Sequence, residues 1–212
     1  YLSAELTLRT GDPKAAEGMY RALVASGVDN FDIRARLASF AQQAGDEAGY
    51  VAQLCAAKKL DPERSYPYQE LATYYASKGD SAAQFAELEH YAMLEQMELE
   101  PVKTLAVGYA KAGKWAKTRT YGELAMFIAP FDAEVLLALG RAYVELGDAA
   151  AGLRTFDIAL TLEPPLRRPA LAHLGRATAL AALGKKSDAK AALAKALTTE
   201  PENKDALALQ AK

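Results

Sequence analysis

The stretch AEVLLALGRAYVELGDAAAGLRTFDIALTLEPPL, residues 133–166, decides the fold of this chain. Gly147 lies near its middle and is followed by Asp148, and Pro164 lies near its end. A glycine can adopt the left-handed backbone that closes a helix, an aspartate can cap the next helix, and a proline cannot continue one. The stretch therefore predicts two helices joined by a tight turn and followed by a break.

The same pattern recurs along the chain. Five glycines stand 34 residues apart, namely Gly11, Gly45, Gly79, Gly113 and Gly147. A sixth, Gly184, follows after 37 residues, and Pro130 and Pro164 are again 34 residues apart. One helix pair cannot bury its own apolar face, so repeated pairs must stack on their neighbours. The spacing predicts an all-α solenoid.

The residues within this interval resemble the tetratricopeptide repeat (TPR), which favours particular large, small and aromatic residues at fixed positions. The fifth repeat carries Leu136, Leu139, Gly140, Tyr143, Gly147, Phe156, Ala159 and Pro164. The fourth carries Leu105, Ala106, Tyr109, Gly113, Ala125 and Pro130. The resemblance implies a right-handed superhelical solenoid of about six helix-turn-helix units with a short C-terminal capping helix.

On this pattern the chain is a single array. Its expected repeats are 1–30 (partial), 31–64, 65–98, 99–132, 133–166 and 167–201, followed by a capping helix in 202–212. Two places depart from the pattern. Gln96 stands where proline is usual, so the second helix of that repeat is expected to run on through Met97. The sixth repeat has one extra residue in or near the loop 164–168 and two late in its first helix, which predicts a longer helix.

Composition excludes several classes of function. The chain has 25 Lys and Arg against 27 Asp and Glu, a net charge of -2, so it lacks the basic excess that nucleic-acid binding needs. No apolar run is long enough to span a membrane. The single cysteine, Cys55, permits no internal disulfide and leaves cytoplasm and periplasm both open. Because Tyr1 already reads as part of a helix, we expect the chain to be a fragment of a longer parent.

The sequence offers no set of residues for catalysis. His90 and His173 are too far apart in sequence to form a metal motif, and no phosphate-binding loop occurs. Cys55 falls on the second helix of its repeat and is expected to be a small buried thiol. The sequence therefore predicts no enzyme activity, no catalytic residue, no metal site and no cofactor.

The resemblance implies a concave face, lined by positions 2, 5, 6, 9, 12 and 13 of each first helix. The expected partner-binding residues on it are Arg9, Arg36, Ser39, Gln42, Tyr66, Gln69, Thr73, Lys103, Lys111, Arg141, His173 and Arg176. Arg141 and Arg176 share position 9 of adjacent repeats and, with Lys103, are expected to form a basic strip. Such a strip suits an acidic peptide or a free C-terminus. The nearby Glu134 and Glu145 offer the alternative that the strip is neutralised.

The leading hypothesis is a non-catalytic scaffold that binds a peptide or partner protein in this groove. Two alternatives stay open. The chain could be a substrate-positioning or assembly module of a larger, bacterial enzyme or of a secretion or envelope protein. It could also self-associate, since an incompletely capped solenoid end can stack on another.

Overall fold

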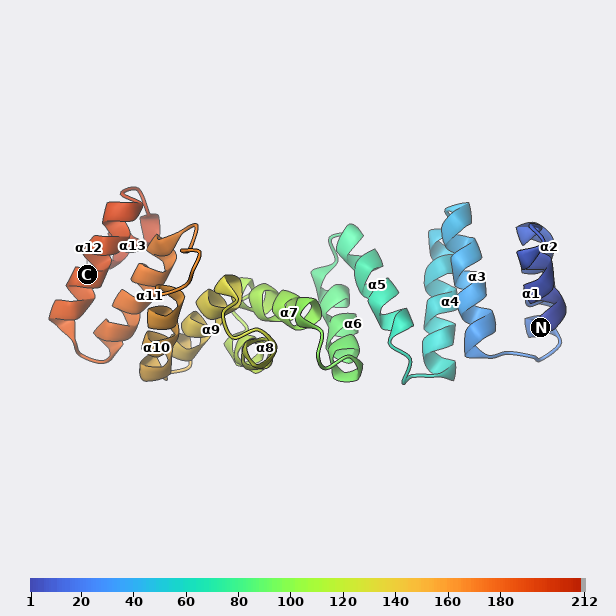
Figure 1. The fold of residues 1–212 in the computed structure, drawn as a ribbon, viewed down its shortest axis with the longest axis horizontal. Helices are drawn as coiled ribbons and strands as arrows, with labels where there is room; N and C mark the ends of the chain where they lie inside the picture. Colours follow the sequence, from blue (N-terminus) through green and yellow to red (C-terminus); the bar gives the residue numbers. More distant parts are fainter. Residues whose placement is uncertain (211–212) are drawn as a thin grey trace. The chain divides into compact units, whose positions relative to one another are not determined.

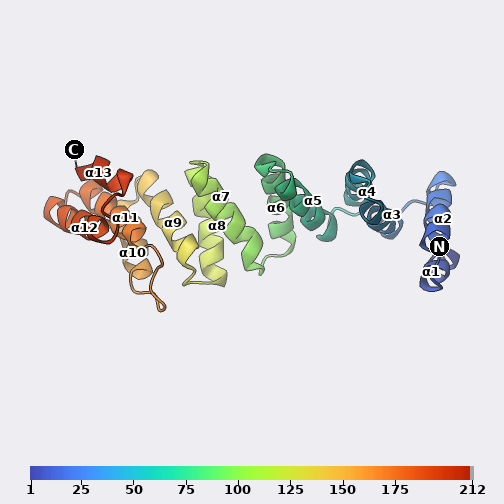
Figure 2. The ribbon, with the colours of Figure 1, turned by 90° about the horizontal axis from the view of Figure 1, so that it is seen from above.

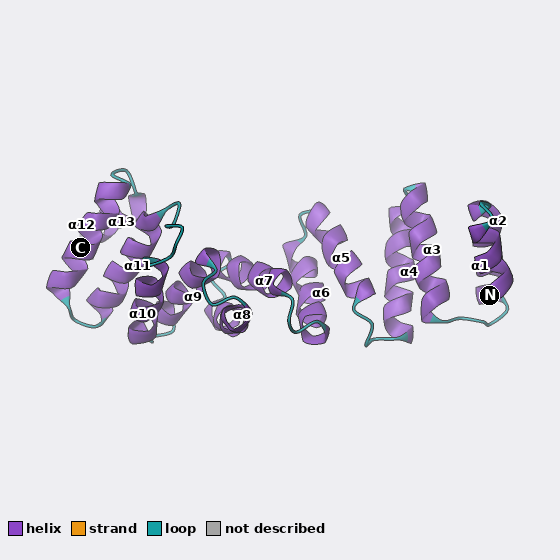
Figure 3. Cartoon of the chain, viewed as in Figure 1, coloured by secondary structure: helices purple, strands orange, loops and turns teal. Residues whose placement is uncertain are grey.

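The computed structural model describes residues 1–210, and over that range the chain consists of helices and short loops with no β-strand (Figures 1 and 3). The all-α helix-hairpin fold is therefore confirmed. The helices form two compact units, an N-terminal unit of residues 1–96 and a C-terminal unit of residues 97–212. Residues 211–212 of the expected capping segment lie outside the described range.

Each unit is built from helix pairs whose members pack side by side, as Figure 2 shows for α3 with α4 and for α5 with α6. The helices of the N-terminal unit are α1 (Leu2–Arg9), α2 (Pro13–Ala25), α3 (Phe31–Ala44), α4 (Glu47–Leu60), α5 (Tyr66–Ser77) and α6 (Ser81–Leu94). Those of the C-terminal unit are α7 (Leu99–Lys111), α8 (Trp115–Ile128), α9 (Ala133–Glu145), α10 (Ala149–Ala159), α11 (Pro169–Ala182), α12 (Lys186–Thr199) and α13 (Lys204–Gln210).

The Gly-Asp turns close one helix and open the next. Gly45 ends α3 with φ 72°, a left-handed conformation that suits glycine. The following Asp46 donates its backbone N–H to the Ala41 carbonyl at 2.9 Å, which satisfies one of the last carbonyls of α3. The Asp46 carboxylate then accepts a hydrogen bond from the Gly49 N–H at 2.8 Å and caps α4. These two residues thus fix the sharp reversal between paired helices.

The expectation that α6 runs on through Met97 is wrong, because α6 ends at Leu94. The next residue, Glu95, has φ -111° and ψ 68°, outside the helical region. Asp61 and Ala129, at the equivalent position of two other repeats, also leave the helical region, and each precedes a proline. Glu95 precedes Gln96 and still breaks the helix. Proline is therefore not needed for this break, which follows the repeat register.

An aromatic ring lies between two glycines in the C-terminal unit. Phe156 of α10 is buried with 2% of its surface exposed, and it packs against Gly140 of α9 and Gly175 of α11. A Cβ atom at residue 140 would lie 2.9 Å from the ring, and one at residue 175 would overlap it. The absence of both side chains lets three helices approach the same ring, which joins one helix pair to the next.

The last helix is tied to the start of α11. Arg168, just before α11, donates to both carboxylate oxygens of Glu200 at 2.9 and 3.0 Å. Asn203 donates to the same carboxylate at 3.0 Å and accepts from the Ala206 N–H at 3.0 Å, so it caps α13. Ala206 is fully buried in the apolar cluster between α11 and α12. These contacts set α13 against the end of the unit.

Gly175→Ala is expected to destabilise the protein by about 1–3 kcal/mol, because a methyl group there overlaps the Phe156 ring in a packed core. This cost exceeds the gain of up to about 1 kcal/mol that alanine brings through helix propensity. Urea unfolding followed by circular dichroism measures the change. Gly18→Ala in α2 is the matched control, since nothing lies within 4 Å of a Cβ there, and it should be neutral or stabilising. Equal midpoints for the two variants would contradict the packing argument.

The Glu200 contacts predict a pH-dependent stability. Hydrogen bonds from Arg168 and Asn203 lower the pKa of Glu200 from 4.5 to about 2. Because the folded-state pKa is depressed, the stabilisation is present above pH 4.5 and is lost as the pH falls from 4.5 towards 2. NMR titration of the Glu200 carboxyl should show this low pKa, and Arg168→Gln should raise it. Arg154→Gln, at an exposed position of α10, should not. An ordinary pKa in the unsubstituted protein would rule out the tie.

Candidate binding groove

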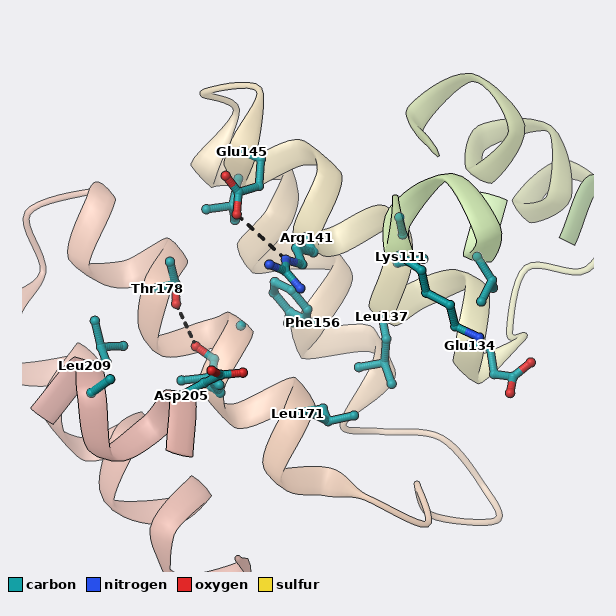
Figure 4. Close-up of a pocket in the computed structure, with 17 residues that line it drawn as sticks. Lys111, Glu134, Leu137, Arg141, Glu145, Phe156, Leu171, Thr178, Asp205 and Leu209 are labelled. Atoms are coloured by element: carbon teal, nitrogen blue, oxygen red, sulfur yellow. Dashed lines mark hydrogen bonds and ion pairs between the residues drawn. The ribbon is translucent and has the colours of Figure 1, made fainter. Parts of the chain in front are cut away.

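A cavity of about 570 Å³ opens on the C-terminal unit, and we call it the groove (Figure 4). Three first helices of successive pairs and the final helix supply nearly all of its lining. The lining residues are Val107, Ala110 and Lys111 of α7; Glu134, Leu137, Ala138, Arg141, Val144 and Glu145 of α9; Phe156 of α10; Leu171, Leu174, Gly175 and Thr178 of α11; and Asp205, Ala208 and Leu209 of α13.

Helical periodicity places these residues on one face. Leu171, Leu174, Gly175 and Thr178 are spaced i, i+3, i+4 and i+7, the spacing of neighbours along a single stripe of a helix. The lining of α9 follows the same rule from Glu134 onward, through Leu137, Ala138 and Arg141. The back of each stripe packs against the core around Phe156, so the helices are fixed in place and their front face is left open.

The floor of the groove is apolar and its border is charged. Leu171 is 36% exposed, while Leu137 and Leu174 are half-buried. The five charged lining residues are Lys111, Arg141, Glu134, Glu145 and Asp205, so the lining carries no positive excess. An open apolar floor is a feature of surfaces that bind other molecules.

Three of the five border charges have opposite charges close by within the unit. Arg141 Nε lies 3.7 Å from Glu145, and Glu134 lies 3.0 Å from the Lys103 ammonium. Lys111 and Asp205 form no ion pair among residues 1–210. Figure 4 shows Lys111 and Asp205 at opposite sides of the groove. These two side chains are therefore the border charges left for a ligand.

Arg141 also stacks on the single tryptophan. Its guanidinium carbon lies 4.9 Å from the centre of the Trp115 ring, at the first turn of α8. A cation at this distance over an indole is attracted by the negative face of the ring. Trp115 is half-buried and does not line the groove. Trp115 nevertheless contacts Arg141, which lines the groove, so its fluorescence can report on the position of Arg141.

Of the four basic residues expected to bind a partner in this unit, two line the groove and two form ion pairs outside it. Lys111 and Arg141 line the groove. Lys103 donates to Asp132 at 2.8 Å, a hydrogen bond that raises the pKa of Lys103. Arg176 bonds to Asp157 of α10 at 2.6 Å. Arg141 and Arg176 thus turn to different partners, and neither they nor Lys103 form a strip of unpaired positive charge.

His173 does not line the groove either. Its Nδ1 atom is buried without a hydrogen-bond partner among the described residues. Burial lowers the pKa of His173, and the charges of Lys195 and Arg176 lower it further. A histidine in this setting stays neutral near pH 7, so it adds no charge to the groove.

A change of register explains why His173 and Arg176 lie elsewhere. Counting 37 residues on from Glu134, Leu137, Ala138 and Arg141 gives Leu171, Leu174, Gly175 and Thr178, and all four line the groove. Aligning Gly175 with Gly140, an offset of 35 residues, selects His173 and Arg176 instead. The start of α11 lies 36 residues after the start of α9 and its end 37 residues after the end of α9, so two extra residues precede α11 and one lies within it. The helix α11 accordingly has 14 residues against 13 for α9.

The residues expected on the N-terminal unit are mostly engaged with their own helices or neighbours. Arg36 lies 3.1 Å from Glu5, which also accepts a hydrogen bond from the Tyr20 hydroxyl at 2.5 Å. Further short-range hydrogen bonds are Gln42 to Tyr50, Gln43 to Ser39, and Thr73 to the Gln69 carbonyl. Arg9 and Tyr66 are exposed. A smaller cavity of this unit, about 300 Å³ between α2, α3 and α4, is lined by none of these expected residues.

Sequence reasoning missed two parts of the groove. It named polar residues and passed over the apolar floor, although Leu137, Ala138 and Val144 occupy positions 5, 6 and 12 of their repeat. It also gave the capping helix no part in the site, whereas Asp205, Ala208 and Leu209 form one wall. The position rule could have found the floor, but no signal in the sequence places α13 beside α11.

Cys55 packs against the apolar cluster of Leu54, Leu71 and Tyr50 and is half-buried, so it is less buried than expected. Residues 1–210 contain no group of three or more His, Cys, Asp or Glu that could hold a metal ion. No described helix has the length and apolar character to cross a membrane.

Comparison with solved structures finds proteins of similar fold. YrrB, described as a TPR protein with an unusual peptide-binding site, matches with a TM-score of 0.68 at 17% identity, over 91% of this chain and 97% of that one. MamA matches with a TM-score of 0.59 at 17% identity, over 81% and 92%. MamA MSR-1 matches with the same score at 19% identity, over 81% and 97%. Comparisons with protein families and with curated proteins find no match. Identities this low establish the fold alone.

Arg141→Gln is expected to shift the fluorescence of Trp115 to longer wavelength, because the half-buried indole loses its guanidinium cover and gains contact with water. The chain has one tryptophan, so steady-state emission reads this contact directly. Arg176→Gln is the matched control, since Arg176 bonds to Asp157 and not to Trp115. An unchanged spectrum for Arg141→Gln would show that the stack does not form in solution.

Proposed function

We propose that this chain, which has the fold of tetratricopeptide-repeat proteins, is a non-catalytic scaffold that holds a segment of a partner protein in the groove. The observation that carries the proposal is the open apolar floor formed by α9 and α11, with leucines accessible to solvent. Contact between exposed apolar surface and water is unfavourable, and covering that surface with a partner lowers the free energy.

The size of the groove supports this proposal. A volume of about 570 Å³ lies within the range of about 300–1,000 Å³ typical of ligand sites. The groove is also held rigid from behind, because Phe156 and the two glycines lock its helices together. A preformed surface avoids the entropic cost of ordering a site on binding.

The chemistry of the lining supports binding over catalysis. The one hydroxyl in the lining, on Thr178, donates to the Leu174 carbonyl at 3.0 Å and so is engaged within its own helix. The lining residues include no histidine or cysteine. A general base or nucleophile would have to come from the border carboxylates, which lie on exposed side chains.

The charges of the lining favour a partner that binds mainly through apolar contacts. An acidic partner was expected from the basic residues, and that idea stays a prediction. Two positive and three negative side chains give the lining no attraction for net negative charge. The positive side chain of Arg141 is further occupied by Glu145 and Trp115.

Peptides selected against the protein test the proposal. A display library of random peptides is selected on the wild type, and the affinities of individual peptides are measured by fluorescence polarisation. Leu171→Glu should weaken their binding by at least about tenfold, since a buried leucine contributes about 1.5–3 kcal/mol and tenfold corresponds to 1.4 kcal/mol.

Leu183→Glu is the matched control. Leu183 follows the same helix, is 39% exposed against 36% for Leu171, and does not line the groove. Circular dichroism checks that both variants fold. Selected peptides that bind all three proteins equally well would overturn the assignment of the groove.

A further inference from the structure

We propose that the occupant of the groove is an amphipathic α-helix of the partner, with its N-terminal end at Asp205 and its C-terminal end at Lys111. This inference rests on the proposed function and adds the class and the direction of the bound segment. Three observations carry it: the lack of hydrogen-bonding groups in the floor, the small residues there, and the two unpaired border charges.

The floor offers no partners for an extended backbone. All lining residues belong to helices, whose internal backbone N–H and C=O groups are already bonded to one another. The lining contains no asparagine, glutamine, serine or tyrosine. Its one hydroxyl is taken by the Leu174 carbonyl. A bound extended segment would bury N–H and C=O groups without partners, at a cost that a helix avoids by bonding its own backbone.

The first helices of the N-terminal unit differ in this respect. Their expected concave positions carry the amides of Gln42 and Gln69 and the hydroxyl of Ser39, while the Thr73 hydroxyl donates to the Gln69 carbonyl. Amides and hydroxyls are the groups that can bond to an extended peptide backbone. The apolar lining of the groove suits a helix, whereas the amides and hydroxyl on the first helices of the N-terminal unit suit an extended segment.

The shape of the floor fits a helical cylinder. Gly175 and Ala138 lie in the floor, with Ala110 and Ala208 nearer its two ends. Small residues let the backbone of a second helix approach closely. The floor also holds Leu137, Leu171 and Leu174. These leucines can pack between large side chains spaced i, i+3, i+4 and i+7 along one face of a partner helix.

Charge sets the direction. Lys111 and Asp205 form no ion pair among residues 1–210 and lie at opposite sides of the groove (Figure 4). A helix carries about half a positive charge at its N-terminus and half a negative charge at its C-terminus. The favourable arrangement therefore sets the N-terminal end of the bound helix at Asp205 and the C-terminal end at Lys111. Glu145, at the C-terminal end of α9 on this face, has Arg141 Nε 3.7 Å away, which offsets its charge.

Two synthetic peptides test the class of the bound segment. The first is a 16-residue peptide with a leucine stripe at helical spacing, free ends, and a side-chain cross-link on its opposite face that locks the helix. The second has the same composition apart from two internal prolines in place of alanines, which prevent helix formation. Fluorescence polarisation should show the locked helix binding at least tenfold more tightly, and Leu171→Glu should remove this binding while Leu183→Glu keeps it.

Cross-linking tests the direction. A photoreactive benzoylphenylalanine is placed at either end of the locked helix, and the labelled residues are found by mass spectrometry. The N-terminal probe should label α13 and the C-terminal probe should label α7. The exchange Lys111→Glu with Asp205→Lys, at two exposed positions, should reverse this pattern.

The outcomes separate the two proposals. If the proline peptide binds as tightly as the locked helix and both depend on Leu171, the groove takes an extended segment, and the helix inference is overturned while the proposed function stands. If binding of neither peptide depends on Leu171, the proposed function falls as well. If the labels do not reverse after the charge exchange, the assigned direction is overturned.

Discussion

Close approach of helices around one aromatic ring is the constraint on which the C-terminal unit depends. Phe156 fills the space between α9 and α11 because residues 140 and 175 have no side chains. A ring held in this way is almost fully buried, and the contacts it makes join two helix pairs that could not bury their apolar faces alone. The stacking of the unit and the spacing of its inner helices both follow from this contact.

The groove is formed by the solvent-facing sides of the helices that pack around Phe156. Phe156 and Gly175 belong to its lining as well as to the core, so the floor cannot shift without disturbing the contacts behind it. The border differs, because its charged side chains stand on exposed positions, and three of the five form ion pairs close by. In binding sites an apolar floor commonly supplies affinity, while an exposed polar border contributes specificity for the partner and its orientation.

The capping helix serves two purposes in this structure. Ala206 closes the apolar end of the last helix pair, as a terminal unit of a solenoid must. Asp205, Ala208 and Leu209 of the same short helix face the groove. The bond network of Arg168, Glu200 and Asn203 that anchors α13 therefore also fixes one wall of the site.

The sequence by itself determined the helix pairs, because glycine turns and aspartate caps act within a few residues of the chain: Gly45 and Asp46 need nothing distant to form their turn. The sequence also determined which residues of α9 face the groove, because successive residues of a helix point in directions that follow from its periodicity. Tertiary structure decided the rest. The break after Leu94 occurs without proline, the register of α11 puts Gly175 in the groove and Arg176 outside it, and α13 becomes a wall. The positions of α11 and α13 depend on contacts between separate helices, and a change of one residue in register turns a helix by about 100° and exchanges the side chains that face the groove.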